Sequence, residues 1–115
     1  MRQNEAYNVQ SRISYATPVD LRNATTDYPD HIRQIYLQVP ESVTPETLAL
    51  ADDIMATHNT AFDKAIAVRN YLREAISYND QIPAPPIDVD PVHYTLFVSQ
   101  EGYCNYYALI QILLI

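Results

Sequence analysis

A lone cysteine, Cys104, is the residue best suited to chemistry in this 115-residue chain. The one glycine, Gly102, stands two residues before it, where a proline-rich stretch gives way to an apolar run. A helix that starts at about Tyr103 would place the thiol in its first turn, where unpaired N–H groups and the helix dipole favour the reactive thiolate. The glycine would let the backbone turn sharply and leave room for another chain to approach the sulfur. This pattern is typical of a nucleophile held at a helix N-terminus.

A buried structural thiol is the alternative interpretation of Cys104, because free cysteine is among the most buried residue types. A nucleophile also needs a base, and the chain offers three histidines, His31, His58 and His93. His93 is nearest in sequence, and a short turn could fold it back toward the thiol. The three are scattered without the spacing of metal ligands, so we expect no metal and no cofactor.

Aromatic and polar neighbours of the thiol suggest a substrate cleft. Tyr103 precedes Cys104 at the junction of loop and helix, and we group it with Gly102 and Asn105 as cleft candidates. Tyr106 and Tyr107 fit core packing better, with each hydroxyl reaching a hydrogen-bond partner.

Composition excludes several classes of protein. The net charge is −7 and the last basic residue is Arg73, so there is no basic stripe for a nucleic acid. A single cysteine rules out an internal disulfide. The polar start of the chain has no signal-peptide pattern. The longest apolar run, Tyr106–Ile115, is about half of the ~20 residues that span a bilayer, which favours a core helix.

The remaining pattern is mainly helical. Alternating residues over Val9–Tyr15 predict a strand. Proline at the first helical position after a capping residue marks helix starts at Thr17, Thr44 and Asp90, and Thr60 caps a further helix with Asp63 at its third position. Helical turns or helices are predicted from Thr17, from Tyr28 to about Ile35, from Thr44 to about Thr57, from Thr60 to about Ile76, from Asp90 to Phe97, and from Tyr103 to the end. Four prolines keep the stretch Gln81–Pro91 irregular.

Several short segments match one known family in order. The stretch from about Tyr15 to Tyr107 resembles the transglutaminase-like domain of bacterial membrane-anchored transglutaminase homologues. The matching segments are Ala16-Thr17-Pro18, Asp27-Tyr28-Pro29, Tyr36-Leu37-Gln38-Val39-Pro40, Phe62-Asp63-Lys64-Ala65, Tyr71-Leu72-Arg73, the Pro83–Pro91 loop, Asp90-Pro91-Val92 and Gly102-Tyr103-Cys104-Asn105-Tyr106-Tyr107-Ala108.

The resemblance implies a papain-like α+β fold, of which this chain would be a mainly helical part with a short N-terminal strand. It also implies that Cys104 is the nucleophile of an acyltransferase or hydrolase acting on a protein or peptide substrate. A sheet after the nucleophile helix would supply a histidine base and an orienting aspartate. Family members of this kind are membrane-anchored, with the catalytic domain outside the cytoplasm.

The chain departs from the family pattern at two points. It stops at Ile115, before that histidine and aspartate, and it has Asn105 where the family often has an acidic residue. We therefore expect residues 1–16 to lead into the domain and residues 17–115 to form its N-terminal helical half, truncated after the nucleophile helix and inactive alone. The alternative is a non-catalytic helical interaction module on the same scaffold.

The final apolar run leads to one further expectation. From Tyr106 to Ile115 only Gln111 is polar, so a helix here is apolar nearly all round and must be surrounded. Exposing a large apolar side chain costs about 1.5–3 kcal/mol. We therefore predict self-association through this helix, with its apolar residues buried against another copy. The residues concerned are Leu109, Ile110, Ile112, Leu113, Leu114 and Ile115.

Overall fold

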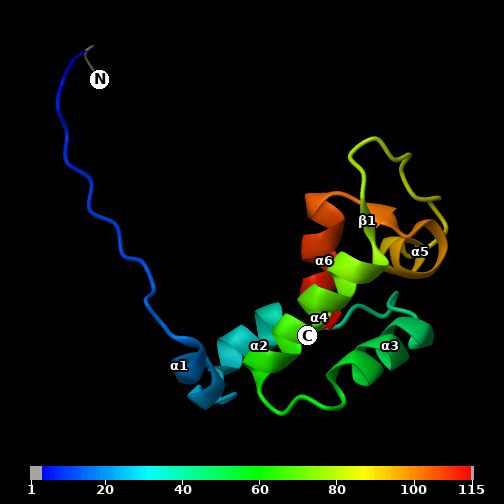
Figure 1. Cartoon of the computed structure of the whole chain (residues 1–115), viewed down its shortest axis with the longest axis horizontal. Helices are drawn as coiled ribbons and strands as arrows, with labels where there is room; N and C mark the ends of the chain where they lie inside the picture. The colour runs from blue at the N-terminus through cyan, green and yellow to red at the C-terminus, as the bar shows by residue number, and fades with distance from the viewer. Residues whose placement is uncertain (1–3, 115) are drawn as a thin grey trace.

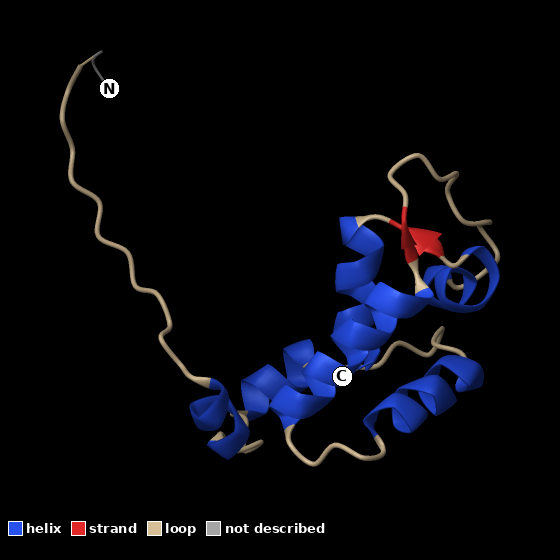
Figure 2. Ribbon diagram, viewed as in Figure 1, coloured by secondary structure: helices blue, strands red, loops and turns tan. Residues whose placement is uncertain are grey.

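The chain is mainly helical in a computed structural model that describes residues 4–114, apart from the side chain of Ile112. An extended N-terminal arm leads into a helical body (Figure 1), whose only strands among the described residues form a short pair (Figure 2). The elements are α1 (Pro18–Asn23), α2 (Asp30–Tyr36), α3 (Pro45–Met55), α4 (Ala61–Ala75), β1 (Ser77–Tyr78), α5 (Pro91–Tyr94), a π-helical turn η1 (Thr95–Ser99), β2 (Glu101–Gly102) and α6 (Cys104–Leu114).

Four helices begin where the capping residues predicted. The hydroxyls of Thr17, Thr44 and Thr60 each accept a hydrogen bond from the backbone N–H three residues on. The Asp90 carboxylate accepts from the N–H of His93 in the same way. These side chains satisfy N–H groups that a helix cannot pair internally, so the sequence sets each start locally.

The core lies between α4 and α6, with α3 and α5 packed at its sides. The buried apolar side chains of the described core are Ala51, Val68, Leu72, Ile76, Val92, Leu96, Ile110 and Leu114. The one polar side chain in the apolar run, Gln111, donates from Nε2 to the backbone oxygen of Ala65 at 3.1 Å. This bond joins α6 to α4 across 46 positions of sequence. It therefore helps to set the position of α6 along the axis of α4.

Two short parallel strands precede the cysteine helix. Ser77 pairs with Glu101 and Tyr78 with Gly102, through bonds from Ser77 N to Gln100 O at 2.9 Å and from Asn79 N to Gly102 O at 2.8 Å. The pairing ties the end of α4 to the residues just before α6. Strands of two residues are too short for an alternating pattern, so the sequence did not predict them.

The predicted N-terminal strand is wrong. Residues 5–17 contain no regular structure, and Val9, Ile13 and Tyr15 are 76%, 67% and 85% exposed. The alternation is present, but no described strand lies beside it to complete a ladder. Since a strand gains its stability from cross-strand pairs, an unpaired segment stays an extended arm.

The expectation that all of the last helix needs another copy is also corrected. Ile110 and Leu114 are buried in the chain's own core, and Leu113 is half-buried, because α4 covers that side of α6. Leu109 is 43% exposed. The side chain of Ile112 and all of Ile115 lie outside the described residues. Among the described residues, no helix has the length and apolar character needed to cross a bilayer.

Candidate active site

Cys104 is exposed and is the first residue of α6. The helix starts there because the Tyr103 carbonyl accepts hydrogen bonds from the N–H groups of Tyr106, at 2.9 Å, and Tyr107, at 3.2 Å. No described group accepts a hydrogen bond from the backbone N–H of Cys104 or Asn105. The thiol therefore stands beside two free N–H groups at the positive end of the helix dipole.

The thiol has one side-chain hydrogen-bond partner among the described residues. Cys104 Sγ donates to Asn105 Oδ1 at 3.8 Å, a long and weak hydrogen bond between exposed neighbours. The contact does not bury the sulfur. The buried structural thiol considered from the sequence is therefore wrong for Cys104.

Gly102 serves a different purpose from the one expected. Its backbone is not in the left-handed region, and the positive φ of 50° in this loop belongs to Gln100. Gly102 is buried, and a Cβ built on it would lie 3.0 Å from Cβ of Tyr106. A glycine is needed at this position because α6 packs directly on the backbone of β2. The side chain of Tyr106 fills the space that a side chain at position 102 would occupy.

The tyrosines divide between two roles. The rings of Tyr103 and Tyr106 meet edge to face, with their centroids 4.9 Å apart. Tyr106 also lines a small pocket of about 180 Å³ with Pro83 and Pro85 of the proline-rich loop. Tyr107 matches the expectation of core packing with a bound hydroxyl, because its Oη donates to Ile76 O at 2.5 Å.

Burial raises the pKa of the Tyr107 phenol, and the nearby Tyr78 phenol raises it further. The two rings are stacked with centroids 6.4 Å apart. Tyr107 therefore keeps its phenol neutral, and its hydrogen bond to Ile76 helps to position α6.

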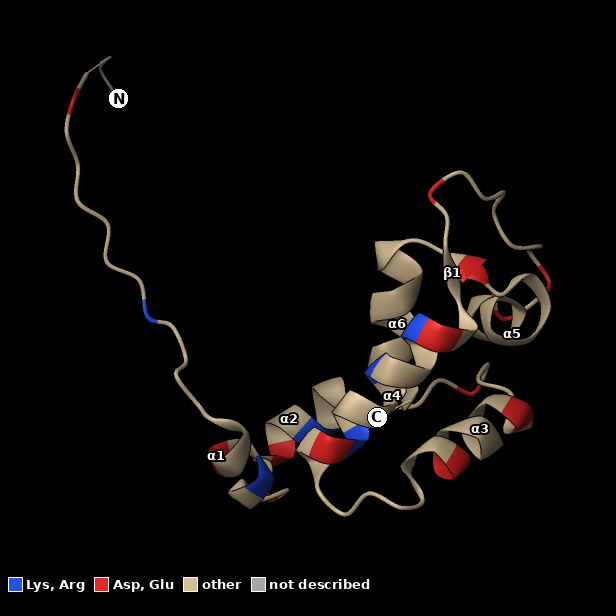
Figure 3. Cartoon of the chain, viewed as in Figure 1, with Lys and Arg blue, Asp and Glu red and all other residues tan. Residues whose placement is uncertain are grey.

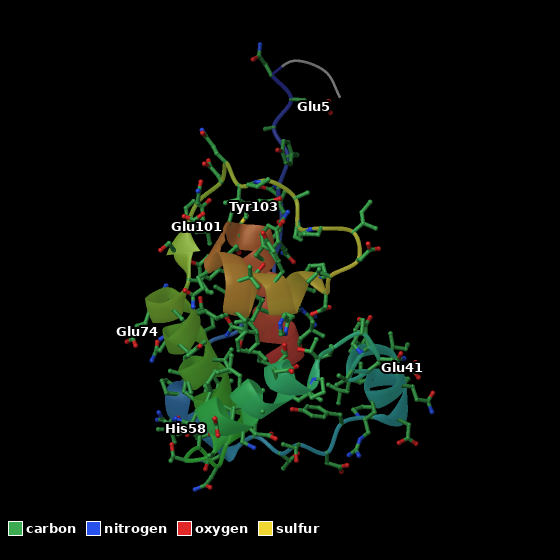
Figure 4. All side chains as sticks on the ribbon, turned by 90° about the vertical axis from the view of Figure 1, so that its right-hand side faces the viewer. Glu5, Glu41, His58, Glu74, Glu101 and Tyr103 are labelled. Atoms are coloured by element: carbon green, nitrogen blue, oxygen red, sulfur yellow. The ribbon has the colours of Figure 1, made fainter. Side chains whose placement is uncertain are left out.

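None of the three histidines, all of which are described, forms a hydrogen bond with the Cys104 thiol. His93 shares a 2.8 Å hydrogen bond between Nδ1 and Thr44 Oγ1, and its ring packs on Phe97. Its role is to join α5 to the start of α3. His58 lies at the opposite end of the body from Tyr103 (Figure 4), and His31 is exposed on α2. A general base must come within about 2.6–3.2 Å of the proton it takes.

Charge is absent along the candidate site helix. α6 carries no charged residue, whereas α4 carries both signs (Figure 3). Asp88 is exposed in the proline-rich loop, and Asp90 is occupied as a helix cap. In the part of the chain that the structure describes, no group of three or more His, Cys, Asp or Glu side chains could hold a metal ion.

Comparison with known proteins places this arrangement in a family. The model of the transglutaminase-like superfamily matches residues 48–115, which include most of α3 and all of α4, both strands and the cysteine helix. The chain belongs to the transglutaminase-like superfamily. The resemblance to the transglutaminase-like superfamily is thereby confirmed over residues 48–115, although the resemblance began earlier, at about Tyr15.

One relative of this transglutaminase-like chain is the uncharacterized protein YebA of Bacillus subtilis (strain 168). The two are 32% identical over 82 residues, which is 70% of this chain and 11% of YebA. The chain thus spans about a tenth of the length of that relative. No solved structure matches the chain.

Proposed function

We propose that this chain carries the nucleophile of a transglutaminase-like cysteine enzyme, and that the nucleophile is Cys104. The observation that carries the proposal is an exposed thiol at the first position of α6, within the family match and beside two free backbone N–H groups.

The proposed reaction is acyl transfer through a thioester. The Cys104 thiolate attacks the carbonyl carbon of a glutamine side chain or peptide amide and forms an S–C bond. The C–N bond then breaks, and the departing nitrogen takes a proton and leaves as ammonia or an amine. An amine or water attacks the thioester next, releasing the acyl product and regenerating the thiol. The choice of acceptor decides between transamidation and hydrolysis.

The free N–H groups support the first step. A tetrahedral intermediate carries negative charge on the former carbonyl oxygen, and donors aimed at that oxygen lower the barrier. The backbone N–H of Cys104 lies next to the attacking sulfur and is the natural donor.

The base is proposed to come from residues outside this chain. None of the three histidines forms a hydrogen bond with the thiol: His93 is bound to Thr44, and His58 lies at the opposite end of the body from Tyr103 (Figure 4). We infer that a histidine and an aspartate from a following sheet complete the site in a longer protein, and that the 115 residues alone have no turnover. The resemblance leads us to propose the same longer protein as membrane-anchored, with this domain outside the cytoplasm.

A second candidate function is a non-catalytic interaction module. The observation that favours it is a narrow uncharged stripe on the exposed side of α6, formed by Cys104, Asn105, Ala108 and Leu109. Self-association through this stripe would bury the Leu109 side chain, and it would also cover the thiol. The two functions are therefore exclusive at this surface.

Turnover tests the proposal in the full-length protein, not in the isolated chain. A glutamine-containing peptide is incubated with hydroxylamine, and hydroxamate and ammonia are measured for the natural protein and for Cys104→Ser. The proposal expects product from the natural protein and none from Cys104→Ser. Turnover that survives the substitution would remove Cys104 from the mechanism. Absence of product in both, with hydrolysis of the peptide also absent, would favour the interaction module.

A further inference from the structure

A pocket in the described part of the chain lies far from the thiol. It has a volume of about 560 Å³ and is formed between α2 with the segment that follows it, the first turns of α4, and the C-terminal end of α6. Leu113, which contributes to it, is nine residues along α6 from Cys104, or about 14 Å at 1.5 Å per residue. Ligand pockets in proteins measure roughly 300–1,000 Å³.

The pocket walls are mainly apolar and aromatic, with Thr26, Gln38 and Asn59 as neutral polar members. Tyr36, Leu37 and Val39 line it, and these side chains are 68%, 55% and 56% exposed. Tyr28 lines it as well. Covering large, solvent-exposed apolar side chains with a ligand is favourable, because it removes apolar surface from water. The pocket thus lies where the end of α2, the start of α4 and the end of α6 each contribute lining residues.

Among the described residues that line the pocket, Lys64 is the only charged one. No carboxylate in the described part of the chain pairs with this lysine, although the net charge of the whole chain is −7. The nearby carboxylates are already engaged, Asp63 with Arg22 at 2.9 Å and Asp27 with Arg33 at 3.5 Å. The pocket therefore presents one positive charge within apolar walls.

We propose that this pocket binds a monocarboxylate with an aromatic or alkyl body. The ammonium of Lys64 pairs with the carboxylate, and the side-chain amide of Asn59, which also lines the pocket, supplies a further donor. The body of the ligand packs on the tyrosine and aliphatic walls. One lysine matches one negative charge, whereas a dianion would keep an uncompensated charge in an acidic protein.

The test uses 3-phenylpropionate, its neutral analogue 3-phenylpropionamide, and N-acetyl-alanyl-phenylalanine, followed by chemical-shift changes in ¹H–¹⁵N NMR spectra of the protein. The acid is expected to move the amide signals of pocket residues such as Leu37 and Lys64 and to bind at least about fivefold more tightly than the amide, because ion-assisted hydrogen bonds exceed neutral ones. Tighter binding of the peptide acid would identify the carboxyl end of a peptide as the source of the carboxylate, and tighter binding of phenylpropionate a free acid.

Variants separate the charge from the cavity. Lys64→Met keeps the stem and should reduce the preference for acid over amide to near unity, whereas Lys64→Arg should retain it. Arg69→Met removes a cation from the same helix outside the pocket and should change nothing. Ala61→Leu, which fills the pocket, should weaken the binding of the acid and of the amide alike.

Equal binding of acid and amide by the natural protein would overturn the proposal. An unchanged preference for the acid in Lys64→Met would also overturn it, as would chemical-shift changes confined to residues outside the pocket. Cys104→Ser should bind as the natural protein does, so this result is independent of the proposed catalysis.

Discussion

Gly102 and Tyr106 pack so closely that no side chain fits between them, since a Cβ on Gly102 would lie 3.0 Å from Cβ and 3.4 Å from Cγ of Tyr106. The contact sets α6 directly on the backbone of β2. The first turn of α6, which carries the thiol, can therefore take this position only because residue 102 is glycine.

Gly102→Ala should destabilise the fold by about 1–3 kcal/mol, because the new Cβ meets a Cβ that is fixed to the helix backbone and cannot swing away. Urea unfolding followed by circular dichroism measures the change. Glu101→Ala, which alters the exposed neighbour in β2 without a clash, is the control and should stay within about 0.5 kcal/mol. An unchanged midpoint for Gly102→Ala would mean that α6 does not pack on β2 in solution.

Tyr107→Phe should lower the free energy of unfolding by about 0.5–1.5 kcal/mol, because the hydroxyl bond to Ile76 O is lost. Tyr78→Phe is the matched control: its ring stacks on Tyr107 but is 68% exposed. Equal effects of the two variants would argue against the buried bond.

Alkaline pH should lower the stability of the fold through Tyr107. The pKa of this phenol is raised in the folded protein, mainly by burial. The unfolded phenol ionises at about pH 10 while the folded one keeps its proton, so stability is constant below about pH 10 and falls above it. The fall measured between pH 9 and pH 11 should be smaller in Tyr107→Phe. An identical fall in the variant would assign it to other groups.

Acid should loosen the start of α4 through Asp63. Hydrogen bonds from Thr60 and then from Arg22 lower the pKa of this carboxyl below its usual value of 3.8. The folded state therefore binds its proton more weakly, and the contribution is present above about pH 4 and lost as the pH falls through the lowered pKa. Asp63→Asn should be less stable at pH 7 and should show a shallower loss between pH 4 and pH 2.5. Chemical denaturation at each pH measures both, and parallel curves for the two proteins would contradict this role.

The proposed self-association through α6 makes its own prediction. Leu109→Glu places a charge in the exposed stripe, and it should shift any oligomer toward monomer in sedimentation velocity at tens of micromolar. Phe97→Glu, at another partly exposed apolar residue, should not. A natural protein that is already monomeric at this concentration would dismiss the interaction surface.

The helix starts could be predicted because they are local. A threonine or aspartate that caps a helix acts through the N–H three residues away, as Thr17, Thr44 and Asp90 do, so neighbouring residues alone determine it. The thiol at the start of α6 was predicted for the same reason. The irregular proline-rich loop follows from its missing donors.

Features that depend on distant partners could not be predicted. The Val9–Tyr15 alternation required a neighbouring strand, and none lies beside it among the described residues. The pairing of Ser77 with Glu101, the packing of Tyr106 on Gly102 and the engagement of His93 by Thr44 each join segments that the sequence pattern does not connect. The role of Gly102 was mistaken because sequence shows that a side chain is missing but not which group takes its place.

The rate of thiol alkylation by iodoacetamide at pH 7 tests the central claim most directly, because it needs neither substrate nor base. Cys104 in the natural protein is compared with a cysteine one turn further along the same exposed stripe, in the double variant Cys104→Ser, Ala108→Cys. The free N–H groups and the dipole at the helix start attract negative charge on an attacking sulfur and position 108 lacks them, so we predict that Cys104 reacts about twofold faster or more. An equal or slower rate at Cys104 would contradict the account, because the start of α6 would then give the thiol no activation.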